Sequence, residues 1–289
     1  MPANSLDRPI VVGVDASESA LHAVRWGAVD AALRGAPLHL VFAVPAVADA
    51  PLDETPVRML HDRLRDTAQS ALDSAAQIAR EAVTDRPAPE IRTFLVDAPA
   101  VTVLSGLAET AYYVVVGVRG MSAYHRSLLG SVSTGVARHA QGPVVVVPGG
   151  VQAISDRPVV VGVDGSVHSV RALELAFDEA SRRGVPLIAV QAWEASGDSD
   201  SDTRIHADSV TLLTGMLERN TAAYPGVDVK ARVMEGHPAR VLLDAAADAQ
   251  LLVVGSHGTR GYPGMALGST GHALLHGSEC PIALVRLRN

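Results

Sequence analysis

Aromatic residues and basic charge are both scarce in this sequence. Aromatic residues make up only 3% of the 289 residues although hydrophobic residues make up 48%, so the apolar content is mostly Val, Ala and Leu. This composition is typical of buried parallel strands and the helices that cover them. The formal net charge is −7. An acidic chain argues against nucleic-acid binding, because contacts to a phosphate backbone need clustered Lys and Arg.

Cysteine and long apolar runs are also nearly absent. The single cysteine, Cys280, excludes an intrachain disulfide and a CxxC metal site, and its place just before an apolar run predicts a buried structural thiol. The histidines lack ligand spacing, so we expect no metal held by protein side chains. No uncharged apolar run approaches the roughly 18 residues of a membrane-spanning helix. Residues 1–8 are polar and lack a signal core, so we expect a soluble, cytoplasmic protein without membrane contact.

What the sequence does contain is an internal repeat. Residues 10–15 read IVVGVD and residues 159–164 read VVVGVD, while VVVGVRG at 114–120 is matched by LVVGSHG at 252–258. The first pair is offset by 149 residues (164 − 15) and the second by 138 (255 − 117), so the first half has the longer middle segment. Self-similarity of this kind indicates one duplicated fold.

Each half alternates short apolar runs with helical patterns. In the first half the expected strands are 10–14, 38–44, 90–96, 113–117 and 143–147, and the expected helices are 18–34, 57–83, 99–110 and 131–140. In the second half the expected strands are 158–163, 187–193, 228–233, 251–255 and 281–286. This alternation predicts the α/β class, with two tandem doubly wound Rossmann-like domains, each a five-stranded parallel sheet flanked by helices. The predicted domains are residues 1–150 and 156–289, because the stretch between them lacks apolar periodicity.

Ligands of doubly wound sheets bind beyond the carboxyl ends of the strands, where the winding reverses. After the expected fourth strand of each half, three glycines and a serine recur with the same spacing, at Gly117, Gly120, Gly130 and Ser131 and at Gly255, Gly258, Gly268 and Ser269. Glycine lets backbone N–H groups approach a ligand, and a helix N-terminus favours an anion. Further hydroxyl donors stand at Ser133 and Thr270. A spacing that occurs twice predicts phosphate binding rather than an ordinary capped loop.

The residue that ends the first strand of each half, Asp15 or Asp164, has two open interpretations. Its carboxylate accepts hydrogen bonds from a ligand, or it forms the turn before a helix that Ser17 or Ser166 caps. Cations near the glycine loops could offset phosphate charge but are equally consistent with solvated loop residues. These cations are Arg119, His125, Arg126, His257 and Arg260.

The G-x2-G-x9-G-[ST] motif, together with an aspartate that ends the first strand, resembles the ATP-binding class of universal stress proteins. The layout is similar to the tandem members common in actinobacteria, whose domains are adenine nucleotide α-hydrolase-like. The resemblance covers about residues 8–148 and 157–287. It implies an adenine pocket near Asp15 and Asp164 that Val44 and Ala192 flank. It also implies that ribose and phosphates are held by Gly117, Gly120, Gly130, Ser131, Val132 and Ser133, and by Gly255, Gly258, Gly268, Ser269 and Thr270.

The resemblance implies a nucleotide-dependent regulator of the stress response that binds one ATP, with Mg²⁺, in each domain and acts on an unknown protein partner. It also implies a homodimer and pairing of the two halves of a chain through their last strands, which would otherwise be exposed edges. The halves differ before the third helix, where the second reads Gly236-His237-Pro238-Ala239 and the first reads Asp97-Ala98-Pro99-Ala100. The two pockets are therefore expected to differ in affinity.

Three alternative functions remain. An enzyme of the adenine nucleotide α-hydrolase type, with slow ATP hydrolysis or autophosphorylation, would be expected to carry an SGGxD-like loop after the first strand, and the sequence lacks one. A dinucleotide-dependent redox enzyme would need GxGxxG at the same place. Finally, one domain could be a degenerate dimerisation module. No P-loop, HExxH, GxSxG or kinase signature is present, so efficient catalysis is not expected.

Overall fold

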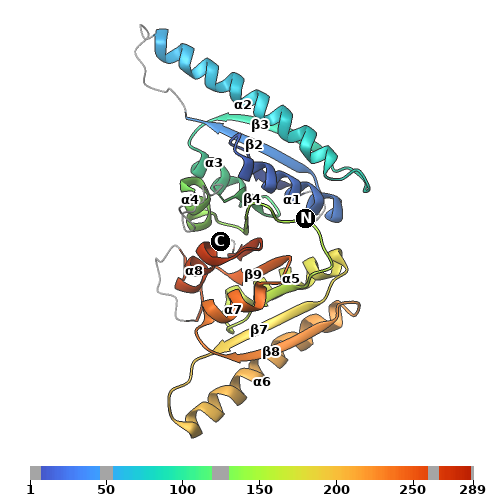
Figure 1. Cartoon of the computed structure of the whole chain (residues 1–289), viewed down its shortest axis with the longest axis vertical. Helices are drawn as coiled ribbons and strands as arrows, with labels where there is room; N and C mark the ends of the chain where they lie inside the picture. Colours follow the sequence, from blue (N-terminus) through green and yellow to red (C-terminus); the bar gives the residue numbers. More distant parts are fainter. Residues whose placement is uncertain (1–7, 46–54, 119–129, 260–266, 288–289) are drawn as a thin grey trace. The chain divides into compact units, whose positions relative to one another are not determined.

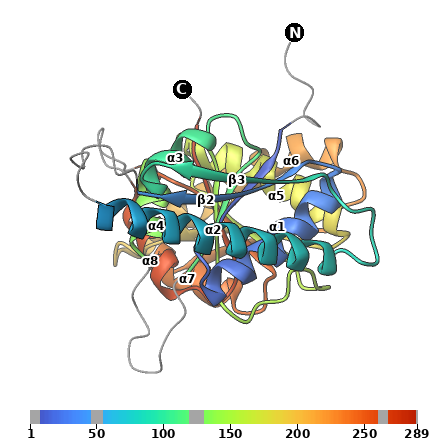
Figure 2. The same ribbon diagram turned by 90° about the horizontal axis from the view of Figure 1, so that it is seen from above.

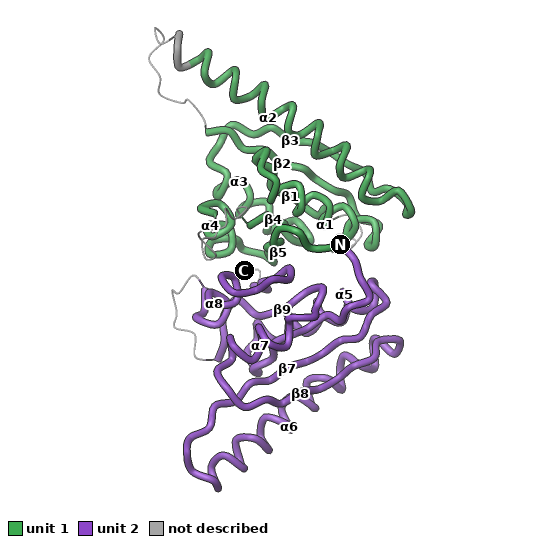
Figure 3. Tube along the Cα trace, viewed as in Figure 1, with its two compact units in different colours: residues 1–153 green, residues 154–289 purple. Residues whose placement is uncertain are grey.

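The computed structural model describes residues 8–45, 55–118, 130–259 and 267–287. The chain divides into two compact units, residues 1–153 (unit 1) and residues 154–289 (unit 2), which Figure 3 shows in different colours. Within these described residues, each unit contains five parallel strands with helices between them, so the predicted fold class is confirmed.

Unit 1 is built on a parallel sheet with strand order β3-β2-β1-β4-β5. Its strands are β1 (Ile10–Gly13), β2 (Leu38–Val44), β3 (Ile91–Asp97), β4 (Val114–Gly117) and β5 (Val144–Val147). Its helices are α1 (Glu18–Arg34), α2 (Thr55–Glu81), α3 (Ala100–Leu107) and α4 (Ser131–His139). Helices α1 and α2 pack together, as do α3 and α4, and α2 runs along β2 and β3 (Figure 2). The two helix pairs therefore cover opposite faces of the sheet, as right-handed crossovers require.

Unit 2 repeats this architecture with strand order β8-β7-β6-β9-β10 (Figure 1). Its strands are β6 (Val159–Gly162), β7 (Leu187–Trp193), β8 (Val229–Glu235), β9 (Leu251–Gly255) and β10 (Ile282–Val285). Its helices are α5 (Val167–Arg183), α6 (Ser199–Ala223), α7 (Pro238–Ala246) and α8 (Ser269–Gly277). Here α5 packs with α6, and α7 packs with α8.

The first helix of each unit begins and ends for the same local reasons. Ser17 and Ser166 are the N-caps, and their side chains accept hydrogen bonds from backbone N–H groups of the first turn. Gly35 and Gly184 end the helices in the left-handed conformation, with φ of 64° and 66°. Glycine adopts this conformation without the steric cost that a Cβ imposes. The serine caps therefore start α1 and α5 directly after the first strands, and the glycines end both helices.

The winding reverses between neighbouring strands β1 and β4, and again between β6 and β9. Val11 and Val12 pair with Val114 and Val115, so the loops that follow β1 and β4 leave the sheet side by side. The expected strands match the observed ones to within about two residues. The helix expected at 99–110 ends earlier, at Leu107, because the chain turns there and the Tyr112 N–H donates to the Pro9 carbonyl at 2.8 Å.

The single cysteine is buried, as its place before an apolar run predicted. Cys280 is 5% exposed, and its burial raises the pKa of the thiol. Within the part of the chain that the structure describes, no helix combines the length and the apolar character that crossing a membrane demands.

Candidate functional site

In unit 2 the loops that follow β6 and β9 meet at Asp164. One carboxylate oxygen of Asp164 accepts from the Ser166 N–H at 3.0 Å, and the other accepts from the Thr259 N–H at 3.0 Å. A Cβ added to Gly258 would lie 2.6 Å from the same carboxylate. Glycine at this position therefore permits Asp164 to hold the β9–α8 loop next to the end of β6.

Unit 1 shows the same turn after its first strand. Asp15 accepts from the Ser17 N–H at 3.1 Å, which is the helix-turn role that the sequence left open for this residue. Ala16 occupies the left-handed region, with φ of 62°, where unit 2 has Gly165 with φ of 81°. Several predicted residues lie outside the described residues, namely Arg119, Gly120, His125 and Arg126 of unit 1 and Arg260 of unit 2.

The helices that follow the glycine loops begin without side-chain caps. Gly130 and Gly268 are the N-caps of α4 and α8, and at neither helix start does a side chain accept a capping hydrogen bond from the first N–H groups. By contrast, α1 and α5 are capped by serine hydroxyls. The first N–H groups of a helix have no intrahelical acceptor and carry the positive end of its dipole. The starts of α4 and α8 are therefore suited to an external anion.

The glycines of the motif occupy their positions for different structural reasons. A Cβ at Gly117 would lie 2.3 Å from the Ser19 carbonyl oxygen, and one at Gly255 would lie 2.8 Å from the His168 Cβ. These two glycines are needed where the fourth strand packs against the first helix. A Cβ at Gly268 would meet nothing closer than 3.4 Å, and the Gly258 nitrogen would be 3.8 Å away. The structure thus brings Gly258 and Gly268 together and leaves room beside Gly268.

The predicted hydroxyl residues are not equally accessible. Ser133 is 3% exposed and donates to the Gly130 carbonyl at 3.1 Å, so its hydroxyl proton is already used within the helix. Ser131 and Ser269 are exposed, whereas Val132 and Thr270 are half-buried. Ser131 and Ser269 are therefore the hydroxyls best placed to reach a ligand.

Three polar residues of unit 2 form a cluster that the motif did not predict. The Ser256 hydroxyl lies 3.0 Å from Nδ1 of His257 and 3.4 Å from Nδ1 of His168. Burial lowers the pKa of His168, and His257 and Arg286 lower it further, while Asp164 acts in the opposite direction. His257 was one of the cations considered from the sequence. No sequence pattern pointed to Ser256 or His168, because the two residues come together only where α5 packs against β9.

The strand ends that were expected to flank adenine are not equivalent in the two units. Val44 is paired with Asp97, whereas Ala192 is paired with Met234 and its neighbour Trp193 is paired with Glu235. The counterpart of Val44 is therefore Trp193, one residue beyond the predicted Ala192. Val44 is 2% exposed and Ala192 is half-buried. The repeat offset of 149 residues (193 − 44) also relates Val44 to Trp193, so the sequence contained the signal for this residue.

No group of three or more His, Cys, Asp or Glu side chains with a metal-binding arrangement occurs among residues 8–45, 55–118, 130–259 and 267–287. These features define a duplicated, doubly wound α/β protein in which uncapped helix N-termini lie beside the loops at the reversal of the winding. The chain belongs to the universal stress protein family, whose model matches residues 8–148 and 157–286.

Similar proteins span the whole chain. A universal stress protein of Mycobacterium tuberculosis is 37% identical over 309 residues, which cover 99% of this chain and 98% of the relative. One from Mycolicibacterium smegmatis is 37% identical over 299 residues and covers 100% of both chains. The crystal structure of a universal stress protein from Archaeoglobus fulgidus has a TM-score of 0.71 and 23% sequence identity, and the match covers 96% of this chain and 98% of that one. That structure supports the fold, and the mycobacterial relatives support the tandem organisation.

Proposed function

We propose that each unit binds one ATP molecule, as its Mg²⁺ complex, at the loop between its fourth strand and fourth helix. The observation that carries this proposal is the uncapped start of α8 beside Gly258, with Asp164 at the adjacent strand end. The family resemblance of the motif supports ATP over other phosphate ligands. An acidic chain is not expected to attract polyanions in general, so local amides have to supply the attraction.

The roles of the residues follow from their places. The N–H groups of Ser269 and Thr270 and the hydroxyl of Ser269 would hold phosphate oxygens, and Gly268 would let the phosphates approach the backbone. Asp164 and Ala192 would lie toward the base. The same roles fall to Ser131, Val132, Gly130 and Asp15 in unit 1, and the strand register gives Ala43, not the predicted Val44, as the counterpart of Ala192. Because no carboxylate cluster was found in the described residues, the phosphates themselves would hold Mg²⁺.

Isothermal titration calorimetry with Mg·ATP tests the proposal, and we expect two nucleotides per chain. The variant Gly268→Ala adds a methyl group for which the protein itself has room, since the nearest atom is 3.4 Å away, and φ of −68° suits alanine. We expect it to weaken binding in unit 2 by about tenfold or more, because the methyl group stands where phosphates approach the backbone. Gly215→Ala, in α6, where a Cβ also meets nothing within 4 Å, is the matched control.

Unchanged affinity in Gly268→Ala, or no binding of ATP by the unmodified chain, would contradict the proposal. A stoichiometry of one would show that one unit is the degenerate module considered above. The nucleotide that copurifies with the protein, identified by mass spectrometry, separates ATP storage from turnover. A predominance of ADP or AMP would favour the α-hydrolase-type enzyme instead.

We also propose that the chain works as a homodimeric regulator in the cytoplasm, whose nucleotide state changes its affinity for a protein partner in the stress response. The support for this is membership of the family and the absence of recognisable catalytic signatures in the sequence. Analytical ultracentrifugation with and without ATP tests the dimer, and a purely monomeric chain in both conditions would contradict it.

A further inference from the structure

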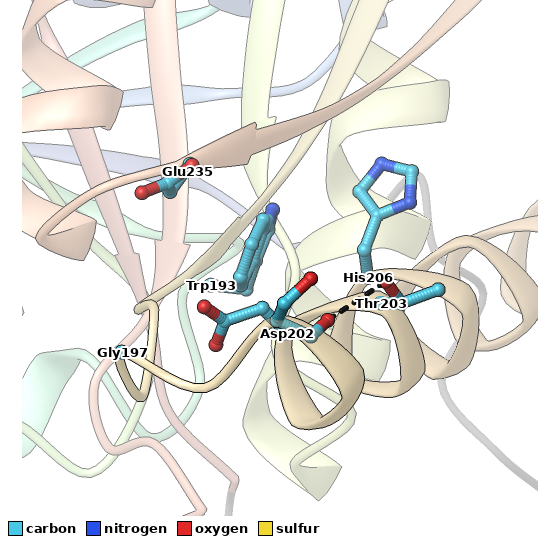
Figure 4. Close-up of a pocket in the computed structure, with 7 residues that line it drawn as sticks. Trp193, Gly197, Asp202, Thr203, His206 and Glu235 are labelled. Atoms are coloured by element: carbon cyan, nitrogen blue, oxygen red, sulfur yellow. Dashed lines mark hydrogen bonds between the residues drawn. The ribbon is translucent and has the colours of Figure 1, made fainter.

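A pocket of about 570 Å³ lies in unit 2 between the ends of β7 and β8 and the first turns of α6. Trp193 and Glu235 line it from the strands, and Asp202, Thr203 and His206 line it from the helix (Figure 4). It contains none of the motif glycines or hydroxyls. Its volume is within the roughly 300–1,000 Å³ of small-molecule sites. The pocket is therefore large enough to be a ligand site separate from the glycine loops.

The walls of this pocket combine an aromatic ring with negative charge. The half-buried Trp193 stands between Glu235 on one side and Asp202 and His206 on the other (Figure 4). The ring centroids of Trp193 and His206 are 5.9 Å apart. The Glu235 carboxylate is exposed and makes no hydrogen bond or ion pair with any residue that the structure describes. A tryptophan face beside a carboxylate is the arrangement that recognises an organic cation.

An anion is disfavoured here even though a helix begins at the pocket. The side chain of Asp198 caps α6 by accepting from the Ser201 N–H at 3.1 Å, and Asp200 and Asp202 occupy the first turn. Asp202 also accepts from the backbone N–H of Ser196 at 2.6 Å. The positive end of the helix dipole is thus already matched by carboxylates of the chain itself.

The equivalent place in unit 1 holds a cation from the chain itself. Strand register makes Asp97 the counterpart of Glu235. In unit 1 the Asp97 carboxylate pairs with the guanidinium of Arg65 and lies 3.3 Å from Nε2 of His61. One copy of the fold therefore binds a guanidinium group at the end of its third strand.

The helices can be aligned by their buried positions. Leu72 and Ala76 of α2 correspond to Leu213 and Leu217 of α6 with one offset of 141 residues (213 − 72 and 217 − 76). The same offset places His206 where unit 1 has Arg65 (206 − 65). Unit 2 thus keeps the carboxylate, lacks the guanidinium and adds an indole ring where unit 1 has an aliphatic side chain.

We propose that this pocket of unit 2 binds a small organic cation with a guanidinium or alkylammonium group. The cation would lie against the Trp193 ring and pair with the Glu235 carboxylate, in the place that the Arg65 side chain fills in unit 1. Because the residues involved are separate from the glycine loops, the proposal does not depend on ATP binding.

The test uses n-butylguanidinium chloride as the probe and n-butylurea as its neutral isostere, at constant ionic strength. The chain has 2 tryptophans, and Trp26 is 1% exposed, so in a Trp26→Phe background the emission of Trp193 reports binding. Calorimetry on the unmodified chain gives the affinity independently of that background. We expect saturable binding of butylguanidinium in the range of about 0.1–1 mM, and no saturation by butylurea.

Three variants sharpen this test. Glu235→Gln and Trp193→Leu should each weaken binding by about tenfold. His206→Arg should restore the internal pair of unit 1, with Glu235 in the role of Asp97, and should block the pocket. Asp97→Asn, which changes unit 1 alone, is the control that should leave the affinity unchanged. All four positions are at least partly exposed, so folding is expected to survive, which circular dichroism checks.

Equal binding of the two probes, or unchanged affinity in both Glu235→Gln and His206→Arg, would overturn the proposal. A capped arginine tripeptide tests whether the ligand is instead an arginine side chain of a protein. If it binds more than about tenfold tighter than free butylguanidinium, the pocket recognises an arginine side chain of a protein and the assignment to a small molecule is wrong.

Discussion

The two units satisfy the same structural demand with different side chains at the end of their first helix. In unit 1, Arg34 Nε donates to Asp30 at 2.7 Å, and the Tyr113 hydroxyl donates to the same carboxylate. In unit 2, Arg183 Nε donates to Glu179 at 2.9 Å, and Arg183 Nη1 donates to Oε1 of Gln250 at 3.1 Å. The ion pair is present in both copies, while the third partner changes. This comparison indicates that the fold requires the charge pair at this place and tolerates variation around it.

The largest predicted effect comes from removing one member of these pairs. The side chains of Asp30 and Glu179 are both 1% exposed. Asp30→Ala and Glu179→Ala should each lower the free energy of unfolding by about 3–5 kcal/mol, because each leaves an arginine charge buried without its carboxylate. Urea denaturation monitored by circular dichroism measures the loss.

An exposed ion pair on α5, the helix that carries Glu179, is the control. Arg171 pairs with Glu174 at 2.7 Å near the surface, and Glu174→Ala should change the free energy of unfolding by less than about 0.5 kcal/mol. If Glu179→Ala cost no more than Glu174→Ala, the buried pair would not be the common requirement of the two units. A larger loss in Asp30→Ala than in Glu179→Ala would instead assign extra weight to Tyr113.

The next largest loss of stability is expected where the fourth strand of each unit packs against the first helix, β4 against α1 and β9 against α5. A Cβ at Gly117 would lie 2.3 Å from a backbone oxygen, and one at Gly255 would lie 2.8 Å from a side-chain carbon. Gly117→Ala should therefore destabilise unit 1 by about 2–3 kcal/mol, and Gly255→Ala should cost unit 2 somewhat less. Thermal unfolding followed by circular dichroism compares the two variants. An effect of the same size at Gly215, where a Cβ meets nothing within 4 Å, would refute the steric explanation.

Much of this fold could be predicted from the sequence because its signals are local. Short apolar runs such as Val144–Val147 become buried strands, and Ser17 caps the start of α1, as one of the two interpretations of that turn expected. The helix expected at 131–140 begins at Ser131 as predicted, and the structure shows that start without a side-chain cap.

The parts that could not be predicted depend on register between distant segments. Ser256 meets His168 across 88 residues of sequence, and no local pattern encodes that contact. The pocket beside Trp193 arises from the register of β7 and β8 with α6, and a slip of one residue would have placed Ala192 there instead. The sequence therefore predicted the loops of the candidate site but not the side chains that distinguish the two copies.

A smaller effect on stability is expected from substitutions in the turns that follow β1 and β6. Ala16 has φ of 62°, in the left-handed region, where unit 2 has Gly165 with φ of 81°. Ala16→Gly should stabilise unit 1 by about 0.5–1 kcal/mol, because it removes the steric cost of a Cβ in that conformation. The reciprocal change, Gly165→Ala, should destabilise unit 2 by about 1–2 kcal/mol, since its Cβ would also lie 3.0 Å from Leu212. Urea midpoints measure both, and changes of the same sign would contradict the argument.

The smallest effect is a dependence on pH that only unit 2 should show at this turn. Burial, followed by His257 and Arg286, lowers the pKa of His168 from the ordinary 6.5, and the opposing effect of Asp164 does not cancel this. The unfolded chain therefore takes up a proton below about pH 6.5 that the folded side chain resists, so stability falls as the pH drops through that range. At the equivalent position, 149 residues earlier (168 − 19), unit 1 has Ser19. His168→Ser should accordingly flatten the decline of the urea midpoint between about pH 7 and pH 5.5, and an unchanged slope would show that His168 is not the source of the decline.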